Sequence, residues 1–325
     1  MREVFVHFVD LASDRLGASV VAASDEFFGE KDRLIAGNPP VANDVYTDRG
    51  KWMDGWETRR RREPGFDWAI VRLGATGIVH GVDVDTTHFK GNYPEACAID
   101  VCSAPGLPSP SWSHAAWREV LPRTLLKGDG HNLFPIHDAS RASHLRLRIV
   151  PDGGVARLRV YGEVVADWAR LTTRGQIDLA AVEHGGIVVA ASDMFFGHRH
   201  NLIMPGDARS MAEGWETRRR RGGGNDWAIV RLGAPGTIER IEVDTRHFKG
   251  NAPGACSLEA CVVSARHPAG DEVIWWEILP HSPLLPDARL AFEDELARVE
   301  RVSYVRLNIY PDGGVARLRI FGRPA

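Results

Sequence analysis

The sequence lacks the features that would place it in several large classes of protein. No apolar run approaches the about 18 residues of a membrane-spanning helix, and residues 1–10 lack the basic and apolar segments of an export signal. The 325 residues carry no surplus of positive charge, with a formal net charge of -3, so no basic surface for nucleic acid is expected. We therefore expect a cytoplasmic protein that binds neither membranes nor nucleic acids.

Common catalytic and metal-binding signatures are also missing. The chain has no Gly-x-Ser-x-Gly elbow, no phosphate-binding loop and no dinucleotide fingerprint, which leaves serine hydrolase, nucleotidase and dehydrogenase functions without support. His198 and His200 have a spacing found in metal sites, but copy one of the repeat described below has Glu30 and Asp32 there. We predict no cofactor and leave a divalent metal open.

Cysteine is scarce, and its spacing argues against disulfides. The four cysteines form two pairs, each five residues apart: Cys97 with Cys102, and Cys256 with Cys261. A strand that rises about 3.3 Å per residue would separate the members of each pair by roughly 16 Å. A disulfide requires Cα atoms within about 7 Å. We therefore predict free, mostly buried thiols.

An internal duplication is the most informative feature of the sequence. Because a long repeat fixes the architecture before any single element is assigned, each half is read as one copy of a common unit. Five blocks of the first half return in the second: residues 23–29 as 191–197, 55–62 as 214–221, 67–74 as 226–233, 85–92 as 244–251, and 151–159 as 311–319.

The two copies differ in length at one place. The block at residue 23 recurs 168 positions later, at 191, whereas the block at residue 55 recurs 159 positions later, at 214, so copy one has nine extra residues (168 minus 159). They lie within residues 38–53, whose prolines and glycine are typical of a lengthened loop. A connecting stretch at residues 163–186 separates the copies, and we predict domains at 1–165 and 166–325.

The apolar pattern of each copy predicts short β-strands. Residues 68–71 form an apolar run of strand length, and Val82 and Val84 alternate with acidic residues. Residues 145–149 and 156–160 alternate on either side of a Pro-Asp-Gly-Gly turn, which predicts a hairpin. Residues 292–302 are the best candidate for a short helix. Short strands separated by glycine and proline favour an all-β fold, a sandwich or jelly roll in each copy.

One repeated block that follows a predicted strand carries four kinds of polar side chain. A histidine can transfer protons near neutral pH, a lysine can bind a carboxylate, and an asparagine suits an amide-like substrate. The alternative is structural: Asp85 and Asn92 would make turn hydrogen bonds, and the ring of His88 would be partly buried. The return of the block intact beside loops that have changed favours function. Its residues are Asp85, His88, Lys90 and Asn92 in copy one and Asp244, His247, Lys249 and Asn251 in copy two.

A second repeated block contains a carboxylate followed by a run of arginines. In an extended chain Glu57, Arg59 and Arg61 share one face, and Glu216 and Arg218 do so in copy two. Arginine can bind a carboxylate through two parallel hydrogen bonds, and the glutamate could act as a base or orient the arginine. The alternative is a solvated charge run with structural ion pairs.

The blocks that begin at Gly50, Asp85 and Pro151 resemble the signature stretches of allantoicases, and the likeness covers nearly the whole chain. It implies two jelly-roll repeats similar to galactose-binding-like domains. It also implies an enzyme of purine and allantoin degradation that hydrolyses allantoate to ureidoglycolate and urea. Copy two has residues 210–213 in place of the Gly-Lys-Trp-Met-Asp lead-in of copy one, so the copies need not hold equivalent sites.

Loss of urea from allantoate requires an acid, a base and an anchor for the carboxylate. On this resemblance, His88 or His247 would transfer the proton, and Glu57 or Glu216 would activate water or orient an arginine. The residues expected to bind the substrate are Arg59, Lys90, Asn92 and Asp85 in copy one and Arg218, Lys249, Asn251 and Asp244 in copy two.

Two other functions stay open at this point. A tandem of sandwiches could bind a sugar or another small ligand without reacting it. A metal-assisted amidohydrolase could use the same loops. Formation of a homo-oligomer is compatible with the sequence, which does not specify it.

Overall fold

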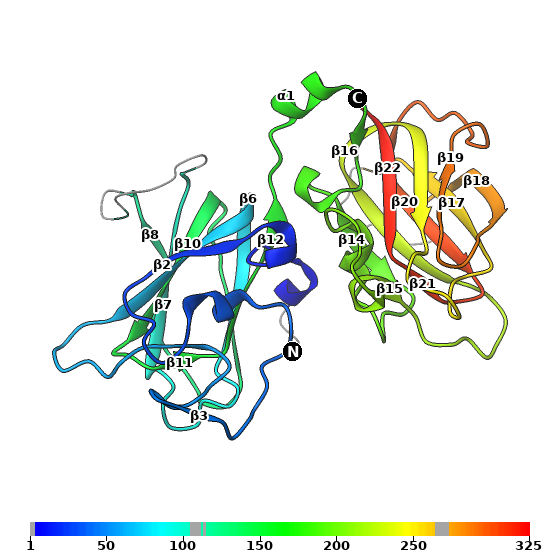
Figure 1. Cartoon of the computed structure of the whole chain (residues 1–325). Coiled ribbons are helices and arrows are strands. Elements are labelled where there is room, and N and C mark those ends of the chain that lie inside the picture. Colours follow the sequence, from blue (N-terminus) through cyan, green and yellow to red (C-terminus); the bar gives the residue numbers. More distant parts are fainter. Residues whose placement is uncertain (1–3, 105–111, 113–114, 264–272) are drawn as a thin grey trace. The chain divides into compact units, whose positions relative to one another are not determined.

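The computed structural model describes residues 4–104, 112, 115–263 and 273–325. The chain divides into two compact units, Met1–Val165 and Ala166–Ala325 (Figure 1), and each β-sheet contains strands of one unit only. The α-helix in the described residues is the single turn α1 (Trp168–Leu171), at the start of unit 2. Among those residues, no helix is long and apolar enough to cross a membrane.

Unit 1 is an all-β sandwich organised around one long strand, β6 (Asp67–Asp85). The strand order is β1-β12-β6-β10-β7-β8, with β2 and β9 also paired with β6, and all of these pairings are antiparallel. The bounds of these strands are β1 (Val9–Asp10), β2 (Ser19–Ala23), β7 (Ala96–Cys102), β8 (Arg118–Leu125), β9 (His131–Pro135), β10 (Arg141–Val150) and β12 (Arg157–Val164).

The 19-residue strand β6 belongs to both layers of the sandwich. Its first half pairs with β2 and β10, whereas its second half pairs with β12 and β9. Val71, Val82 and Val84 are fully buried, because both layers turn apolar side chains toward one core. The strands predicted at residues 68–71 and 82–84 are confirmed, and the structure joins them into one.

The predicted hairpin between residues 145–149 and 156–160 is wrong. Both segments are strands, β10 and β12, but they pair with opposite halves of β6 and not with each other. Pro151 has no N–H to extend a ladder from β10. The glycines after it enter β11 (Gly154–Val155), which pairs with β5 (Trp56–Glu57) and so leads the chain away before β12 begins.

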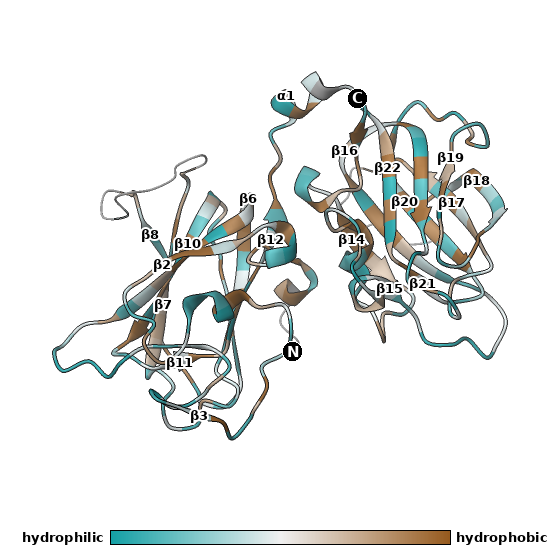
Figure 2. Ribbon diagram, in the orientation of Figure 1, coloured by the Kyte–Doolittle hydropathy of each residue, from teal (hydrophilic) through white to brown (hydrophobic). Residues whose placement is uncertain are grey.

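Unit 2 repeats this arrangement strand for strand, as the predicted duplication of a jelly-roll sandwich requires. Its order is β13-β22-β16-β20-β17-β18, with β14 and β19 on β16. Figure 2 shows polar and apolar residues alternating along β20 and β22, as expected for strands with one buried face. The bounds are β13 (Ile177–Asp178), β14 (Ile187–Ala191), β16 (Asp226–Asp244), β17 (Ala255–Cys261), β18 (Trp276–Pro283), β19 (Arg289–Phe292), β20 (Val302–Tyr310) and β22 (Arg317–Pro324).

The short helix predicted at residues 292–302 is also wrong. Phe292 ends β19 and Val302 begins β20, and both side chains are buried in the sandwich. The residues between them are exposed or half-buried, so no apolar stripe of helical period is available to pack.

In each unit the first strand pairs with the last, β1 with β12 and β13 with β22. An aspartate fastens each pairing. The carboxylate of Asp10 accepts a hydrogen bond from the Val160 N–H over 2.9 Å, and that of Asp178 accepts one from the Ile320 N–H over 3.0 Å. Each sandwich is therefore closed by its own ends.

Candidate active site

The three repeated polar blocks meet in each unit. In unit 1, Glu57 on β5 lies opposite Gly154 on β11. On its other side the backbone of Glu57 bridges Gly29, whose N–H donates to the Glu57 carbonyl oxygen over 3.1 Å. The equivalent residues of unit 2 are Glu216 on β15 (Trp215–Glu216), Gly314 on β21 (Gly314–Val315), and Gly197.

Two glycines allow this close approach of three segments. A Cβ atom on Gly29 would lie 2.2 Å from the Gly55 carbonyl oxygen, and one on Gly154 would lie 1.9 Å from the ring of Phe89. Phe89 is fully buried. Any side chain at either glycine would therefore displace Glu57.

An asparagine from the Asp-Thr-x-His-Phe-Lys-Gly-Asn loop holds the glutamate. The Nδ2 of Asn92 donates to Oε1 of Glu57 over 2.8 Å, and the Asn92 carbonyl oxygen accepts from the Gly154 N–H over 2.8 Å. In unit 2 the Nδ2 of Asn251 donates to Oε1 of Glu216 over 2.6 Å. The pair predicted from two separate blocks is thus brought together in both copies.

Burial raises the pKa of Glu57 above its usual value, and the hydrogen bond from Asn92 offsets part of that rise. The second carboxylate oxygen, Oε2, has no partner within the described residues. A carboxylate with a raised pKa and one free oxygen can accept a proton from water.

Two cavities adjoin the Glu57–Asn92 pair in unit 1. The loop cavity has a volume of about 550 Å³ and is lined by extra residues of copy one together with His88 and Lys90. The rim cavity has a volume of about 600 Å³ and is lined by part of the arginine run and by Asp152. Both are lined by Phe28, Glu57, Gly91 and Asn92. A molecule bound at the pair can therefore extend into either cavity.

The wall of the loop cavity contains the predicted extra loop. Part of it forms a hairpin of β3 (Tyr46–Thr47) and β4 (Gly50–Lys51). Arg157, which is buried, holds both ends of the loop: its Nε donates to the Asn38 carbonyl oxygen over 3.0 Å and its Nη2 to Oδ2 of Asp54 over 2.8 Å. The guanidinium of Arg157 thus joins the two ends of the loop.

His88 lines the loop cavity and also ties down its wall. The backbone of His88 is left-handed, with φ of 71°, and its N–H donates to Asp129 over 2.9 Å. Its Nε2 lies 3.3 Å from the Pro40 carbonyl oxygen. In unit 2, Nε2 of His247 lies 2.8 Å from the Ala208 carbonyl oxygen. Each histidine therefore contacts the loop that covers its own block.

The remaining candidates of copy one are placed differently. Lys90 lines the loop cavity, with its Nζ 3.8 Å from Asp129. Arg59 and Asp85 line neither cavity. Nε of Arg59 donates to Oδ2 of Asp25 over 2.7 Å, and Asp85 accepts from the Thr87 N–H over 2.8 Å. The last two candidates thus make structural contacts.

The shared face expected for Glu57, Arg59 and Arg61 stays a prediction, because the arginine run lies beyond the assigned strand. The strand β5 ends at Glu57, and the Thr58 N–H donates to the Gly153 carbonyl oxygen over 3.1 Å, next to the Glu57–Gly154 pair. The arginines that line the rim cavity with Glu57 are Arg60 and Arg62.

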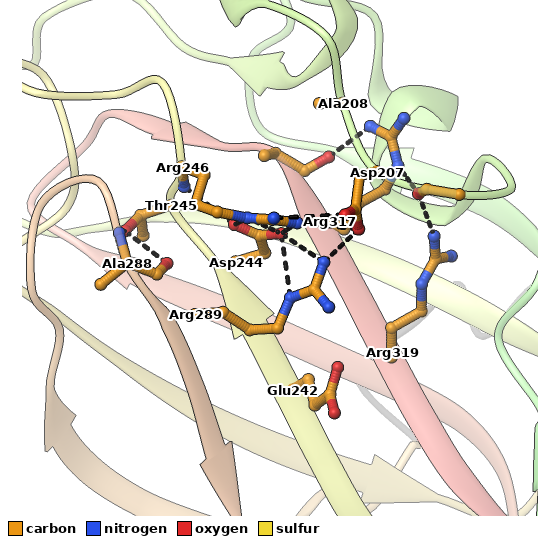
Figure 3. A network of polar contacts seen from close by, with 12 residues as sticks. Asp207, Ala208, Glu242, Asp244, Thr245, Arg246, Ala288, Arg289, Arg317 and Arg319 are labelled. Atoms are coloured by element: carbon orange, nitrogen blue, oxygen red, sulfur yellow. Dashed lines mark hydrogen bonds and ion pairs between the residues drawn. The ribbon is translucent and has the colours of Figure 1, made fainter.

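Unit 2 departs from unit 1 around its shorter loop (Figure 3). Arg246 stands where unit 1 has Thr87, and its Nη2 lies 2.6 Å from Asp244 and 2.8 Å from Asp207 of the loop. Arg289 pairs with the same two aspartates. The hydrogen bonds from these arginines lower the pKa of Asp207 to about 2. The loop of unit 2 is therefore held by ion pairs. Lys249 and Arg218 pair with Asp287 and Asp193, as Lys90 and Arg59 pair with Asp129 and Asp25 in unit 1.

Several cavity residues were not among the sequence candidates. The sequence indicates that the lead-in at residues 50–54 could shape a deeper pocket in copy one, but it does not single out the side chains that line the cavities. The cavity residues that were missed include Arg49, Lys51, Trp52 and Arg60. The described residues contain no group of three or more His, Cys, Asp or Glu side chains arranged to bind a metal ion.

A duplicated β-sandwich with a carboxylate–amide pair beside polar cavities defines a two-repeat protein with a small-molecule site. One protein family matches both repeats. Residues 9–165 and 177–325 match the allantoicase repeat family, and the chain therefore belongs to the allantoicase family.

Proteins similar to this chain include a probable allantoicase of Pseudomonas paraeruginosa, 50% identical over 98% of this chain and 97% of that protein. Another is probable allantoicase 1 of Burkholderia mallei, 47% identical over 97% of this chain and 94% of that protein. The crystal structure of allantoicase from Saccharomyces cerevisiae has a TM-score of 0.84 and 35% identity, and the match covers 97% of this chain and 92% of that one.

Proposed function

We propose that this chain hydrolyses allantoate to ureidoglycolate and urea, and that the reaction takes place beside Glu57 of unit 1. Membership of the allantoicase family supports the substrate. The observation that carries the site is the Glu57–Asn92 pair, a carboxylate with a raised pKa that is held from one side and adjoins two cavities.

The groups at the site match the needs of this reaction. Allantoate carries two ureido groups and a carboxylate on one carbon. Its C–N bond breaks as the other ureido nitrogen forms a C=N bond and the departing nitrogen takes a proton from His88. Water then adds to the carbon and gives a proton to Glu57, so that one water is consumed and one urea released. Asn92, whose Nδ2 is bound to Glu57, has its Oδ1 available for a ureido N–H.

Unit 1 is the better site for this reaction. Its extra loop supplies a cavity of about 550 Å³ next to the pair. In unit 2 the shorter loop is held through Asp207 by Arg246 and Arg289, and different residues replace the Gly-Lys-Trp-Met-Asp stretch at 50–54. We assign the pair in unit 2, Glu216 with Asn251, to the architecture of the repeat.

Incubation of the full chain with allantoate and measurement of released urea test the proposal. Glu57→Gln keeps the shape and the contact with Asn92 but cannot accept a proton, so turnover should fall by roughly 10²- to 10⁴-fold. Glu216→Gln is the matched control and should keep wild-type turnover. Binding of allantoate without urea release would instead make the chain a ligand-binding tandem. Equal losses in the two variants would overturn the assignment to unit 1.

We also propose that residues 1–165 and 166–325 are separate domains in a cytoplasmic protein. The limits of the two family repeats support the domains, and four free, buried cysteines are compatible with a reducing compartment. Expression of each unit alone, followed by thermal unfolding, tests the first point, and cell fractionation tests the second.

A further inference from the structure

The arginine run divides into two kinds of residue. Arg59 is bound to Asp25, and Nη1 of Arg61 lies 3.0 Å from the buried Oδ1 of Asp67. Within the described residues, Arg60 and Arg62 have no hydrogen-bond or ion-pair partner, although both line the rim cavity. Unit 2 repeats the division: Arg218 and Arg220 are bound to Asp193 and Asp226, and Arg219 and Arg221 have no partner in the described residues.

The unpaired guanidinium groups are the available positive charge of the rim cavity. Two of its three carboxylates are engaged, since Asp152 accepts from the Arg61 N–H over 2.8 Å and Glu95 lies 3.1 Å from Arg123. The third is Glu57, which is held by Asn92. A negatively charged group that enters this cavity would therefore meet arginine that no other acid neutralises.

The cations of the loop cavity are less available. Lys51 lies 2.9 Å from Asp44. Arg49 has no acidic partner in the described residues, but its Nη1 donates to the Phe27 carbonyl oxygen over 3.0 Å and its guanidinium lies over the Phe27 ring, so these contacts position it. Lys90 remains, but its compact ammonium lacks the planar fork that matches a carboxylate. The loop cavity is thus better suited to the ureido arms than to the carboxylate of the proposed substrate.

We infer that Arg60 binds the carboxylate of the substrate in the rim cavity, while a ureido arm extends into the loop cavity. This inference rests on the proposed function. Arg60 follows Glu57 by three residues, so their Cα atoms are at most about 11 Å apart, whereas those of Arg62 and Glu57 can be about 18 Å apart. Arg60 can therefore form two parallel hydrogen bonds with a carboxylate whose central carbon faces Glu57.

A matched pair of unreactive probes tests the inference without relying on turnover. N-Carbamoylglycine carries a carboxylate and one ureido group on a single carbon, and its neutral amide differs only in the charged group. In titration calorimetry with the full chain, Arg60→Gln should weaken binding of the acid about 10-fold or more and change binding of the amide less than about two-fold. Arg219→Gln, the equivalent change in unit 2, should alter neither.

Kinetics with allantoate provide a second measurement. Arg60→Gln should raise KM more than it lowers kcat, and Arg60→Lys should recover part of the loss because it restores the charge without the fork. Equal weakening of acid and amide, no weakening of either, or failure of the wild-type chain to bind the acid would overturn the inference. If the probes behave as expected but no urea is released from allantoate, the proposed function fails and the carboxylate site stands.

Discussion

Removal of the Asn92 side chain should shift the pH profile of catalysis in a direction that the structure determines. The Nδ2 of Asn92 donates to Oε1 of Glu57 over 2.8 Å and so stabilises the ionised carboxylate. A hydrogen bond to a charged group contributes about 1.5–3 kcal/mol, and partial exposure of Glu57 favours the lower value. One pKa unit corresponds to about 1.4 kcal/mol. Asn92→Ala should therefore raise the pKa of Glu57 by about one unit.

The assay is the initial rate of urea release from allantoate between pH 4 and 9. If ionised Glu57 is the base, the acid limb of kcat/KM should move to higher pH by about one unit in Asn92→Ala. The plateau can also fall, because Asn92 lines both cavities, so the position of the limb is the diagnostic quantity. Asn251→Ala removes the same contact from unit 2 and should leave the limb in place. An unmoved limb, a shift to lower pH, or an equal shift in the control would refute the reasoning.

His88→Ala should reduce turnover by roughly 10²- to 10⁴-fold, as expected for loss of a proton donor, while His247→Ala should leave it unchanged; full turnover in both would remove histidine from the mechanism. All four cysteines should react with a thiol reagent after denaturation without reduction, and fewer than four would show a disulfide. Burial raises the pKa of Asp178 to about 6, so the folded state binds its proton more tightly than the unfolded state. Unfolding measurements should therefore show stability falling by about 2–3 kcal/mol as pH rises from about 4 to about 6, and Asp178→Asn should remove most of this dependence.

The parts of the fold that could be predicted are those with a local or repeated pattern. Val82 and Val84 alternate with acidic residues, and this period of two is sufficient to predict a strand. The duplication predicted two copies of one sandwich because whole blocks recur. The prediction of the hairpin is wrong because no local or repeated pattern specifies which strands pair. Strand pairing is a long-range property, and the turn at Pro151 leads β12 to the other half of β6 instead of back along β10.

The candidate site also has parts that local patterns predict and parts that they do not. The residue types were found because polar blocks recur, and the contact between Glu57 and Asn92 joins two of those blocks. The choice among the arginines was not accessible, because it depends on Asp25 binding Arg59 and Asp67 binding Arg61. Arg157 reaches both ends of the extra loop, and no local pattern records these contacts across more than 100 residues.

The pairing of first and last strands within each unit has a consequence for how such a chain can arise and change. β1 pairs with β12 and β13 pairs with β22, so each unit contains all the strands of its own sandwich. A gene that is duplicated and fused end to end therefore encodes two complete sandwiches. One copy can then lose its pocket loop and still fold. The protein stays active as long as the other copy retains its site. The same closure predicts that each unit tolerates circular permutation, with its natural ends joined by a short linker and new ends opened in an exposed loop.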